Sequence, residues 1–243
     1  MLFIKREIVL SIAIVLAAVS AIWVHPDAQY PGYIDCRTLA VLFCLMTVVA
    51  GFRKLGFFDL LAEKLLARTK TVAGVAFVLV FLCFFLSMVI TNDVALITFV
   101  PFTITIMHKM EEKLRRKWML RVIIMQTLAA NLGSMFTPIG NPQNLYLYGM
   151  SDDTVFVFLR LMFPYTLVSG ILLAGWIILC AAGSGKNHEK TEIKITEKTD
   201  WKRHFDMGKY AVCATLLFIS LLAVGRILPY EIPLGCVLIY TLL

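Results

Sequence analysis

Three consecutive polar residues, Thr91, Asn92 and Asp93, interrupt an apolar stretch that extends from residue 71 to residue 107. Hydroxyl, amide and carboxylate oxygens are the ligands expected of a hard cation such as Na⁺. Ser87 lies one helical turn before Thr91 and adds a second hydroxyl. A helix that begins after the interruption would also direct its positive dipole end and free N–H groups toward an anion. The residue types therefore predict a site for a cation, an anion or both.

Of the 16 acidic residues, Asp93 is the one that stands inside a long apolar segment rather than in a loop, at a helix end or on an amphipathic face. A lone carboxylate at membrane depth needs a cation, a proton or a strong hydrogen-bond partner. In the alternative interpretation, Asp93 caps the following half-helix and Asn92 makes a tight turn. Capping explains the residue types, but it does not explain why the break falls inside the apolar stretch.

A second polar interruption covers residues 133–144, which read GSMFTPIGNPQN. Two prolines and two glycines within twelve residues cannot continue a regular helix. We therefore predict a broken helix over residues 118–148, with its first part from Trp118 to about Leu132. The alternative is an ordinary external loop, which is disfavoured because apolar segments flank the break closely.

The composition is that of an integral membrane protein. Of the 243 residues, 60% are hydrophobic and 16% are charged, which leaves too little polar surface to cover a soluble globule. The formal net charge is +7, but the basic residues cluster between apolar segments and form no basic-aromatic motif, so we expect no nucleic acid partner. The scattered cysteines and histidines lack zinc-ligand spacing, and the apolar segments show no nucleophile paired with a base, so an enzyme is disfavoured.

The basic clusters predict the topology, because Lys and Arg accumulate on the cytoplasmic side of membrane proteins. We place these regions on that side: the N-terminus, residues 53–70, residues 108–117 and the linker 184–209. Of the 23 Lys and Arg residues, the following then fall on the opposite side: Arg37, Arg160 and Arg226. The apolar stretch 71–107 therefore enters and leaves by the same face, as a re-entrant hairpin.

Shorter elements complete the prediction. Residues 55–67 have the pattern of an amphipathic helix on the inner surface. Ser151 to Asp153 read as the N-cap of a short helix over 154–162, and a separate span is expected over 164–182. Further apolar spans are expected over 210–224 and from Ile232 onward.

Both interruptions resemble motifs of the ion transporter superfamily. The matching segments are residues 87–95 (SMVITNDVA) with Pro101 beyond, residues 131–134 (NLGS) and residues 137–144 (TPIGNPQN). The nearest resemblance is to citrate-transporter-like anion permeases, which include the divalent anion:sodium symporters. Arsenite permeases and sodium/proton antiporters are more distant. The motifs cover about residues 35–180, and the rest is similar by hydropathy.

The resemblance implies an all-α polytopic membrane protein with two inverted repeats, each with a re-entrant hairpin and a discontinuous helix. Residues 1–183 would form the first repeat, with the hairpin at 71–107 and the broken helix at 118–148. Residues 184–209 would be a cytoplasmic linker, and residues 210–243 the start of a truncated second repeat. We thus expect a fragment or truncated product of a transporter nearly twice as long.

The resemblance also implies site residues. The implied cation ligands, for Na⁺, are Ser87, Thr91, Asn92 and Gly133, and we expect the lone carboxylate of Asp93 to join them. The implied anion-binding residues are Asn92, Asp93, Thr137, Pro138, Gly140, Asn141 and Asn144. Asp93 departs from the Thr of dicarboxylate symporters, and a carboxylate there would repel a dianion unless it is protonated or paired with a cation. This departure favours proton coupling or a different anion.

The expected function is secondary active transport of a small organic or inorganic anion, such as a citrate-like carboxylate or an oxyanion. Alternating access would couple it to Na⁺ or H⁺, without another cofactor. One alternative is a Na⁺/H⁺ antiporter, and another is a non-transporting membrane scaffold or truncated product. We expect a multi-pass protein in the lipid bilayer of a bacterial or archaeal plasma membrane, with a cytoplasmic N-terminus. The resemblance is compatible with a homodimer.

Overall fold

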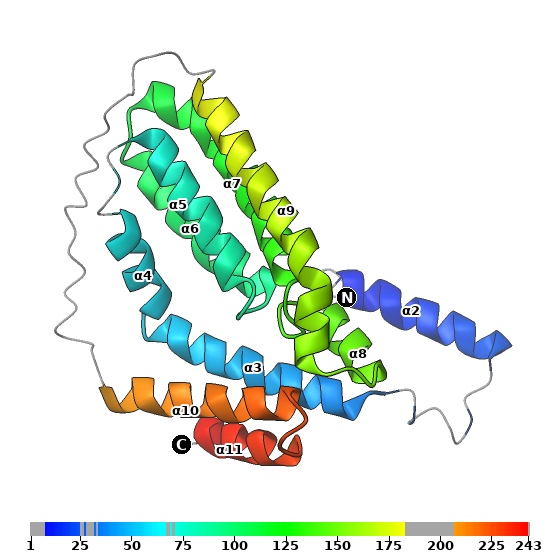
Figure 1. Cartoon of the computed structure of the whole chain (residues 1–243). Coiled ribbons are helices and arrows are strands. Elements are labelled where there is room, and N and C mark those ends of the chain that lie inside the picture. The colour runs from blue at the N-terminus through cyan, green and yellow to red at the C-terminus, as the bar shows by residue number, and fades with distance from the viewer. Residues whose placement is uncertain are drawn as a thin grey trace. The chain divides into compact units, whose positions relative to one another are not determined.

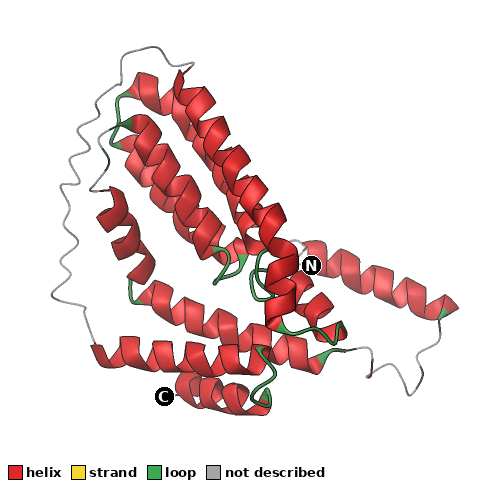
Figure 2. Ribbon diagram, in the orientation of Figure 1, coloured by secondary structure: helices red, strands yellow, loops and turns green. Residues whose placement is uncertain are grey.

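The structure is a computed structural model that describes residues 8–24, 27, 32, 34–66, 69, 71–182 and 207–242. Throughout these residues the regular elements are helices, with no strand among them (Figure 2), so the predicted all-α class is confirmed. The helices are α2 (Ile8–Trp23), α3 (Cys36–Lys54), α4 (Phe57–Leu66), α5 (Val72–Leu86), α6 (Asn92–His108), α7 (Glu112–Ser134), α8 (Pro142–Met150), α9 (Val155–Ala182), α10 (Met207–Val224) and α11 (Glu231–Leu242).

The chain divides into two compact units, residues 1–36 and residues 37–243. The first unit contains α2 and Cys36, the first residue of α3. The second unit contains the rest of α3 and the helices from α4 to α11. Within the described residues, α3, α9 and α10 are long and apolar enough to cross a membrane, and α2, α5, α6 and α11 are shorter apolar helices. Most of the predicted linker, residues 184–206, lies outside the described residues.

Helix α7 is the centre of the larger unit. It packs against α5, α6 and α9, and α5 also contacts α4, α6 and α9 (Figure 1). The apolar cluster that these helices share includes the fully buried side chains Leu79, Phe99 and Trp118. Burial of each such side chain contributes about 1.5–3 kcal/mol relative to exposure in water, although lipid weakens this term at the outer faces.

Helices α5 and α6 run antiparallel and join at residues 87–91, so residues 71 and 109 lie at the same end of the pair (Figure 1). The start of α7 and the end of α9 lie at that end as well. This arrangement agrees with the expectation that residues 71–107 fold back on themselves and return to the side of the basic loop 108–117. Re-entry into the membrane stays a prediction.

The remaining helices of this unit meet in two further apolar clusters. In one, Leu45 of α3 packs with Leu145 and Tyr148 of α8 and with Val224 of α10. The other joins α3, α10 and α11 through these buried residues: Cys44, Val48, Leu216 and Val237. Helix α8, the short arm after the second interruption, is therefore held between α3 and α10.

The structure corrects one expected boundary. The short helix 154–162 and the span 164–182 were predicted as separate elements, but they form the single helix α9, which continues through Pro164. Proline removes one helical hydrogen bond, and membrane helices tolerate this loss when packing holds both arms. Here Phe158 and Leu173, on either side of Pro164, are buried in different apolar clusters.

Gly133, in the last turn of α7, allows a close approach between α7 and α5. A Cβ atom at this position would lie 2.1 Å from the carbonyl oxygen of Phe84 and 2.6 Å from the hydroxyl of Ser87. Because the first neighbour is backbone, α5 or α7 would have to move to accommodate a methyl group.

We therefore expect Gly133→Ala to lower the free energy of unfolding by about 1–3 kcal/mol, through overpacking. Thermal unfolding in detergent, followed by near-ultraviolet circular dichroism, measures the change. Gly175→Ala is the matched control, because no atom lies within 4 Å of a Cβ at Gly175 in α9. A loss of stability in Gly133→Ala no larger than in the control would contradict this packing.

A buried amide joins the three central helices. Gln126 of α7 is fully buried, and its Nε2 donates to the hydroxyl of Thr103 in α6 at 2.8 Å and to the carbonyl oxygen of Leu79 in α5 at 3.3 Å. Its Oε1 is buried without a hydrogen-bond partner among the described residues, as is the hydroxyl of Thr98. Interhelical hydrogen bonds of this kind contribute about 0.6–2 kcal/mol in membranes.

Thr103→Val should lower the free energy of unfolding by about 1 kcal/mol, because it removes the better of the two acceptors of a buried amide. The double variant Gln126→Leu/Thr103→Val should recover most of this loss, since neither polar partner then remains. Unfolding by denaturing detergent, monitored by circular dichroism, gives the double-mutant cycle. Additive effects of the two substitutions would show that Gln126 and Thr103 do not interact.

Candidate functional site

The first interruption is the segment 87–91 between α5 and α6. Ser87 is fully buried, and its hydroxyl donates to the carbonyl oxygen of Phe84 at 2.9 Å. The N–H of Ile90 donates to the carbonyl oxygen of Leu86, the last residue of α5, at 2.8 Å. Thr91 then takes an extended conformation at the N-cap position of α6, where its side chain makes no capping hydrogen bond. The chain thus leaves one helix and enters the next within a single short segment.

The second interruption separates α7 from α8. Asn141 is the N-cap of α8, since its Oδ1 accepts from the N–H of Asn144 at 2.7 Å. Pro142 follows as the first residue of the helix, where its missing N–H costs nothing. The Nδ2 of Asn144 lies within hydrogen-bonding distance of three carbonyl oxygens, those of Ser134 (3.4 Å), Met135 (3.0 Å) and Thr137 (3.1 Å). One side chain therefore satisfies carbonyl groups that the end of α7 leaves unpaired.

The two interruptions contact each other directly. The N–H of Asn92 donates to the carbonyl oxygen of Gly140 at 3.1 Å, and the Nδ2 of Asn92 donates to Oδ1 of Asn131 at 3.0 Å. The hydroxyl of Thr137 donates to the carbonyl oxygen of Met88. Each break thereby supplies hydrogen-bond partners that the other break lacks.

Gly140 makes this contact possible. A Cβ atom there would lie 2.0 Å from the carbonyl oxygen of Ser134, so no larger residue fits without displacing the backbone. The neighbouring Pro138 and Ile139 are buried as well. The second interruption is therefore a compact turn that packs against the first.

Asp93 lies in the first turn of α6 and is exposed. Its N–H donates to Oδ1 of Asn92 at 2.9 Å, but its carboxylate makes no hydrogen bond or ion pair with any residue that the structure describes. Thr91, and not Asp93, occupies the N-cap position, so Asp93 does not cap α6 in the way that the alternative interpretation supposed. Its charge is nevertheless favourable beside the positive end of the helix dipole.

The structure brings some of the predicted site residues together. Ser87 touches Gly133 across the α5–α7 contact, and Asn92 binds Gly140. Thr91 lies beside a small apolar cavity that Ile139 also lines. The first N–H groups of α6 do not all remain free for an anion as expected, because those of Asn92 and Asp93 already have partners within the chain.

Asn131 is absent from the predicted site residues, although it binds the side chain of Asn92. Its amide also donates to the carbonyl oxygen of Thr127 at 2.8 Å, which fixes its orientation. The signal was present in the sequence, since Asn131 opens the NLGS segment that precedes the second interruption. Within that segment, the sequence predicted only Gly133 as a cation ligand.

Among the described residues, no group of three or more His, Cys, Asp or Glu side chains could hold a metal ion. A sodium site built from hydroxyl, amide and carbonyl oxygens does not require such a group. The donors gathered at the two interruptions are of this neutral type, with Asp93 as the single anionic group beside them.

Comparison with known proteins bears on what these interruptions do. Residues 1–242 match the model of a family described as citrate transporter. The chain is 36% identical to the inner membrane protein YbiR of Escherichia coli (strain K12) over 152 residues, which are 63% of this chain and 39% of that protein. It is 34% identical to the uncharacterized transporter MJ0456 of Methanocaldococcus jannaschii over 168 residues, 69% of this chain and 45% of the relative.

A more distant similarity extends to the P protein of Homo sapiens, with 31% identity over 134 residues, which are 54% of this chain and 15% of that protein. In each case the chain matches less than half the length of the relative. The family match, by contrast, extends over nearly the entire chain, so this protein is a membrane protein that belongs to the citrate transporter family.

Proposed function

We propose that the protein functions in secondary active transport of a small anion, coupled to Na⁺ or H⁺ by alternating access. The observation that carries the proposal is the direct pairing of two interrupted helices, through Asn92 and Gly140, beside the exposed carboxylate of Asp93. Interrupted helices are tolerated at membrane depth where they line a binding cavity. Membership of the citrate transporter family supports the same function.

On the cation side, the proposed ligands are those of the first interruption with Gly133: Ser87, Thr91, Asn92 and Asp93. Ser87 and Gly133 are already adjacent, and the side-chain amide of Asn92 is held by Asn131 near the end of α7. Asp93 would add the charge that a coupling ion needs. A bound Na⁺ or proton would in turn neutralise Asp93 and allow an anion to approach.

On the anion side, the proposed residues are Asn92, Asp93, Thr137, Pro138, Gly140, Asn141 and Asn144. Asn141 and Asn144 hold the turn in place through Oδ1 and Nδ2, respectively. They would therefore act mainly by positioning the backbone around an anion. Neither interruption contains Lys or Arg in residues 87–93 or 133–144, so binding would depend on neutral donors and on the coupling cation.

The proposed setting is the plasma membrane of a bacterium or archaeon, with a cytoplasmic N-terminus and two inverted repeats. The similarity to an inner membrane protein supports this location. The helix pair α5 and α6 would be the re-entrant hairpin, and α7 with α8 the discontinuous helix. The helices α10 and α11 would open the second repeat.

The alternative function is exchange of Na⁺ for H⁺ without an organic substrate. The combination of a lone carboxylate with no basic residue in either interruption favours it specifically, since such a site attracts cations without help from an anion. A non-transporting scaffold is a third class, in which Asp93 would have no function.

Counterflow in vesicles distinguishes these functions. We expect labelled citrate, sulfate or arsenite to exchange across the membrane, and expect its uptake to rise with an inward Na⁺ or H⁺ gradient when the two are varied separately. Vesicles with no protein are the control. Exchange of Na⁺ for H⁺ with no movement of any anion would instead establish the antiporter. No movement of any of these solutes would overturn both the anion transporter and the antiporter.

Asp93→Asn should raise the concentration of coupling ion needed for half-maximal uptake by roughly 10- to 100-fold, because it replaces a charged ligand worth about 1.5–3 kcal/mol. If the proton is the coupling ion, the pH dependence of uptake should be lost instead. Initial uptake rates across a series of Na⁺ concentrations and pH values measure both effects.

Asp153→Asn is the matched control, because Asp153 is also exposed but lies in the segment between α8 and α9. It should leave the ion dependence unchanged. Wild-type ion dependence in Asp93→Asn would favour the scaffold and remove Asp93 from the site.

A further inference from the structure

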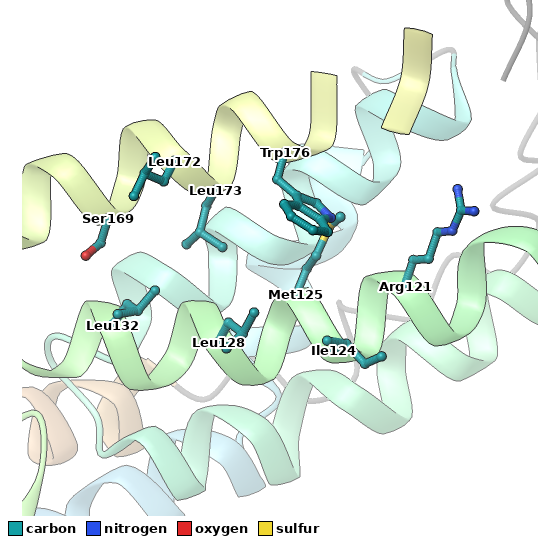
Figure 3. Close-up of a pocket in the computed structure, with 9 residues that line it drawn as sticks. All are labelled: Arg121, Ile124, Met125, Leu128, Leu132, Ser169, Leu172, Leu173 and Trp176. Atoms are coloured by element: carbon teal, nitrogen blue, oxygen red, sulfur yellow. The ribbon is translucent and has the colours of Figure 1, made fainter. Parts of the chain in front are cut away.

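An open apolar groove runs between α7 and α9, and one of its ends lies next to the second helix interruption. Its volume is about 290 Å³. Residues of α7 on one side and of α9 on the other line it, among them Leu128, Leu132, Ser169, Leu172 and Trp176. Figure 3 shows Leu132 and Ser169 toward one end of the groove, and Arg121 and Trp176 toward the other.

The groove has the length of one membrane leaflet. At about 1.5 Å of rise per residue, the distance along α7 from Arg121 to Leu132 is about 16 Å. The hydrocarbon core of a bilayer is about 30 Å thick, so each leaflet contributes about half of that. An extended acyl chain that enters beside Arg121 would therefore end near Leu132, next to the second helix interruption.

The two ends of the groove differ in polarity in the way that a phospholipid does. The wall is apolar along Leu128 and Leu172, whereas Arg121 carries a guanidinium at one end (Figure 3). Lys117 lies one turn before Arg121 on the same face of α7, but it does not line the groove. Trp176, which is 62% exposed, lies across the groove from Met125, toward the end where Arg121 stands (Figure 3), and tryptophan is typical of the boundary between headgroups and acyl chains.

The charge of Arg121 has no acidic partner among the residues that the structure describes. The ion pair recorded among those residues joins Arg116 to Glu112 at 2.6 Å, and it does not involve Arg121. Arginine side chains at membrane depth extend toward the headgroup region and bind phosphate there. Basic residues at the mouth of an apolar groove between helices are typical of sites for anionic lipid headgroups.

We infer that the groove between α7 and α9 binds one anionic phospholipid, with its phosphate at Arg121 and an acyl chain along Leu128 and Leu172. The charge complementarity at the groove comes from Arg121, and Trp176 packs against the part of the acyl chain nearest the phosphate. This site is independent of the ion and anion site proposed at the interruptions. It therefore stands or falls separately from the transport function.

Quenching of Trp176 fluorescence tests the site. The protein is reconstituted in phosphatidylcholine vesicles that contain a small fraction of lipid with brominated acyl chains, either phosphatidylglycerol or phosphatidylcholine. The signal of Trp176 is the part of the quenching that disappears in Trp176→Phe. We expect half-maximal quenching at a fraction of brominated phosphatidylglycerol about fivefold lower than the fraction of brominated phosphatidylcholine that has the same effect. This is the preference that one basic residue confers.

Arg121→Gln should bring the two brominated lipids to within about twofold of each other, while quenching by the zwitterionic lipid stays unchanged. Arg116→Gln is the matched control, because it removes one positive charge from the same helix but from a residue outside the groove. It should retain the preference. An equal loss in both variants would show that surface charge in general, and not this groove, attracts the lipid.

Two further outcomes would overturn the inference. Equal quenching by both lipids in the unmodified protein would mean that Arg121 selects no headgroup. No quenching of Trp176 by either lipid would mean that a second copy of the chain, or another part of the protein, covers the groove.

Discussion

The structure depends on one constraint, which is that an interrupted helix leaves backbone N–H and C=O groups without helical partners, so other groups of the protein must pair with them. The two interruptions meet this constraint jointly. Asn92 donates its backbone N–H to Gly140, and Thr137 donates its hydroxyl to Met88. Asn144 pairs the carbonyl groups at the end of α7. Each break therefore depends on the other for part of its hydrogen bonding.

Close packing holds the interruptions at the right distance. Gly133 brings the end of α7 against α5, and Gly140 lets the second break fold onto Ser134. About two turns before Gly133, the buried amide of Gln126 ties α7 to α5 and α6. These contacts make α7 the element that aligns both breaks, so a shift of α7 would change both of them together.

This arrangement divides the polar residues of the region by role. Asn141, Asn144 and Thr137 have hydrogen bonds that hold the backbone, and Asn92 bridges the two breaks. Asp93 stands outside that network, with an exposed carboxylate at the positive end of α6. The helix dipole favours this charge, but the carboxylate has no side-chain partner among the described residues, and this is why the proposed function assigns it to an ion.

The sequence by itself determined the helical class and the place of both interruptions, because Pro138, Pro142 and the polar run at Thr91 act on the backbone locally. It did not determine that Pro164 would lie inside one continuous helix, or that Asn131 would bind Asn92. Those outcomes depend on neighbours far along the chain, such as the packing of α9 against two clusters and the approach of α7 to α5. Local chemistry can stop a helix, but only tertiary contacts decide which unpaired groups meet.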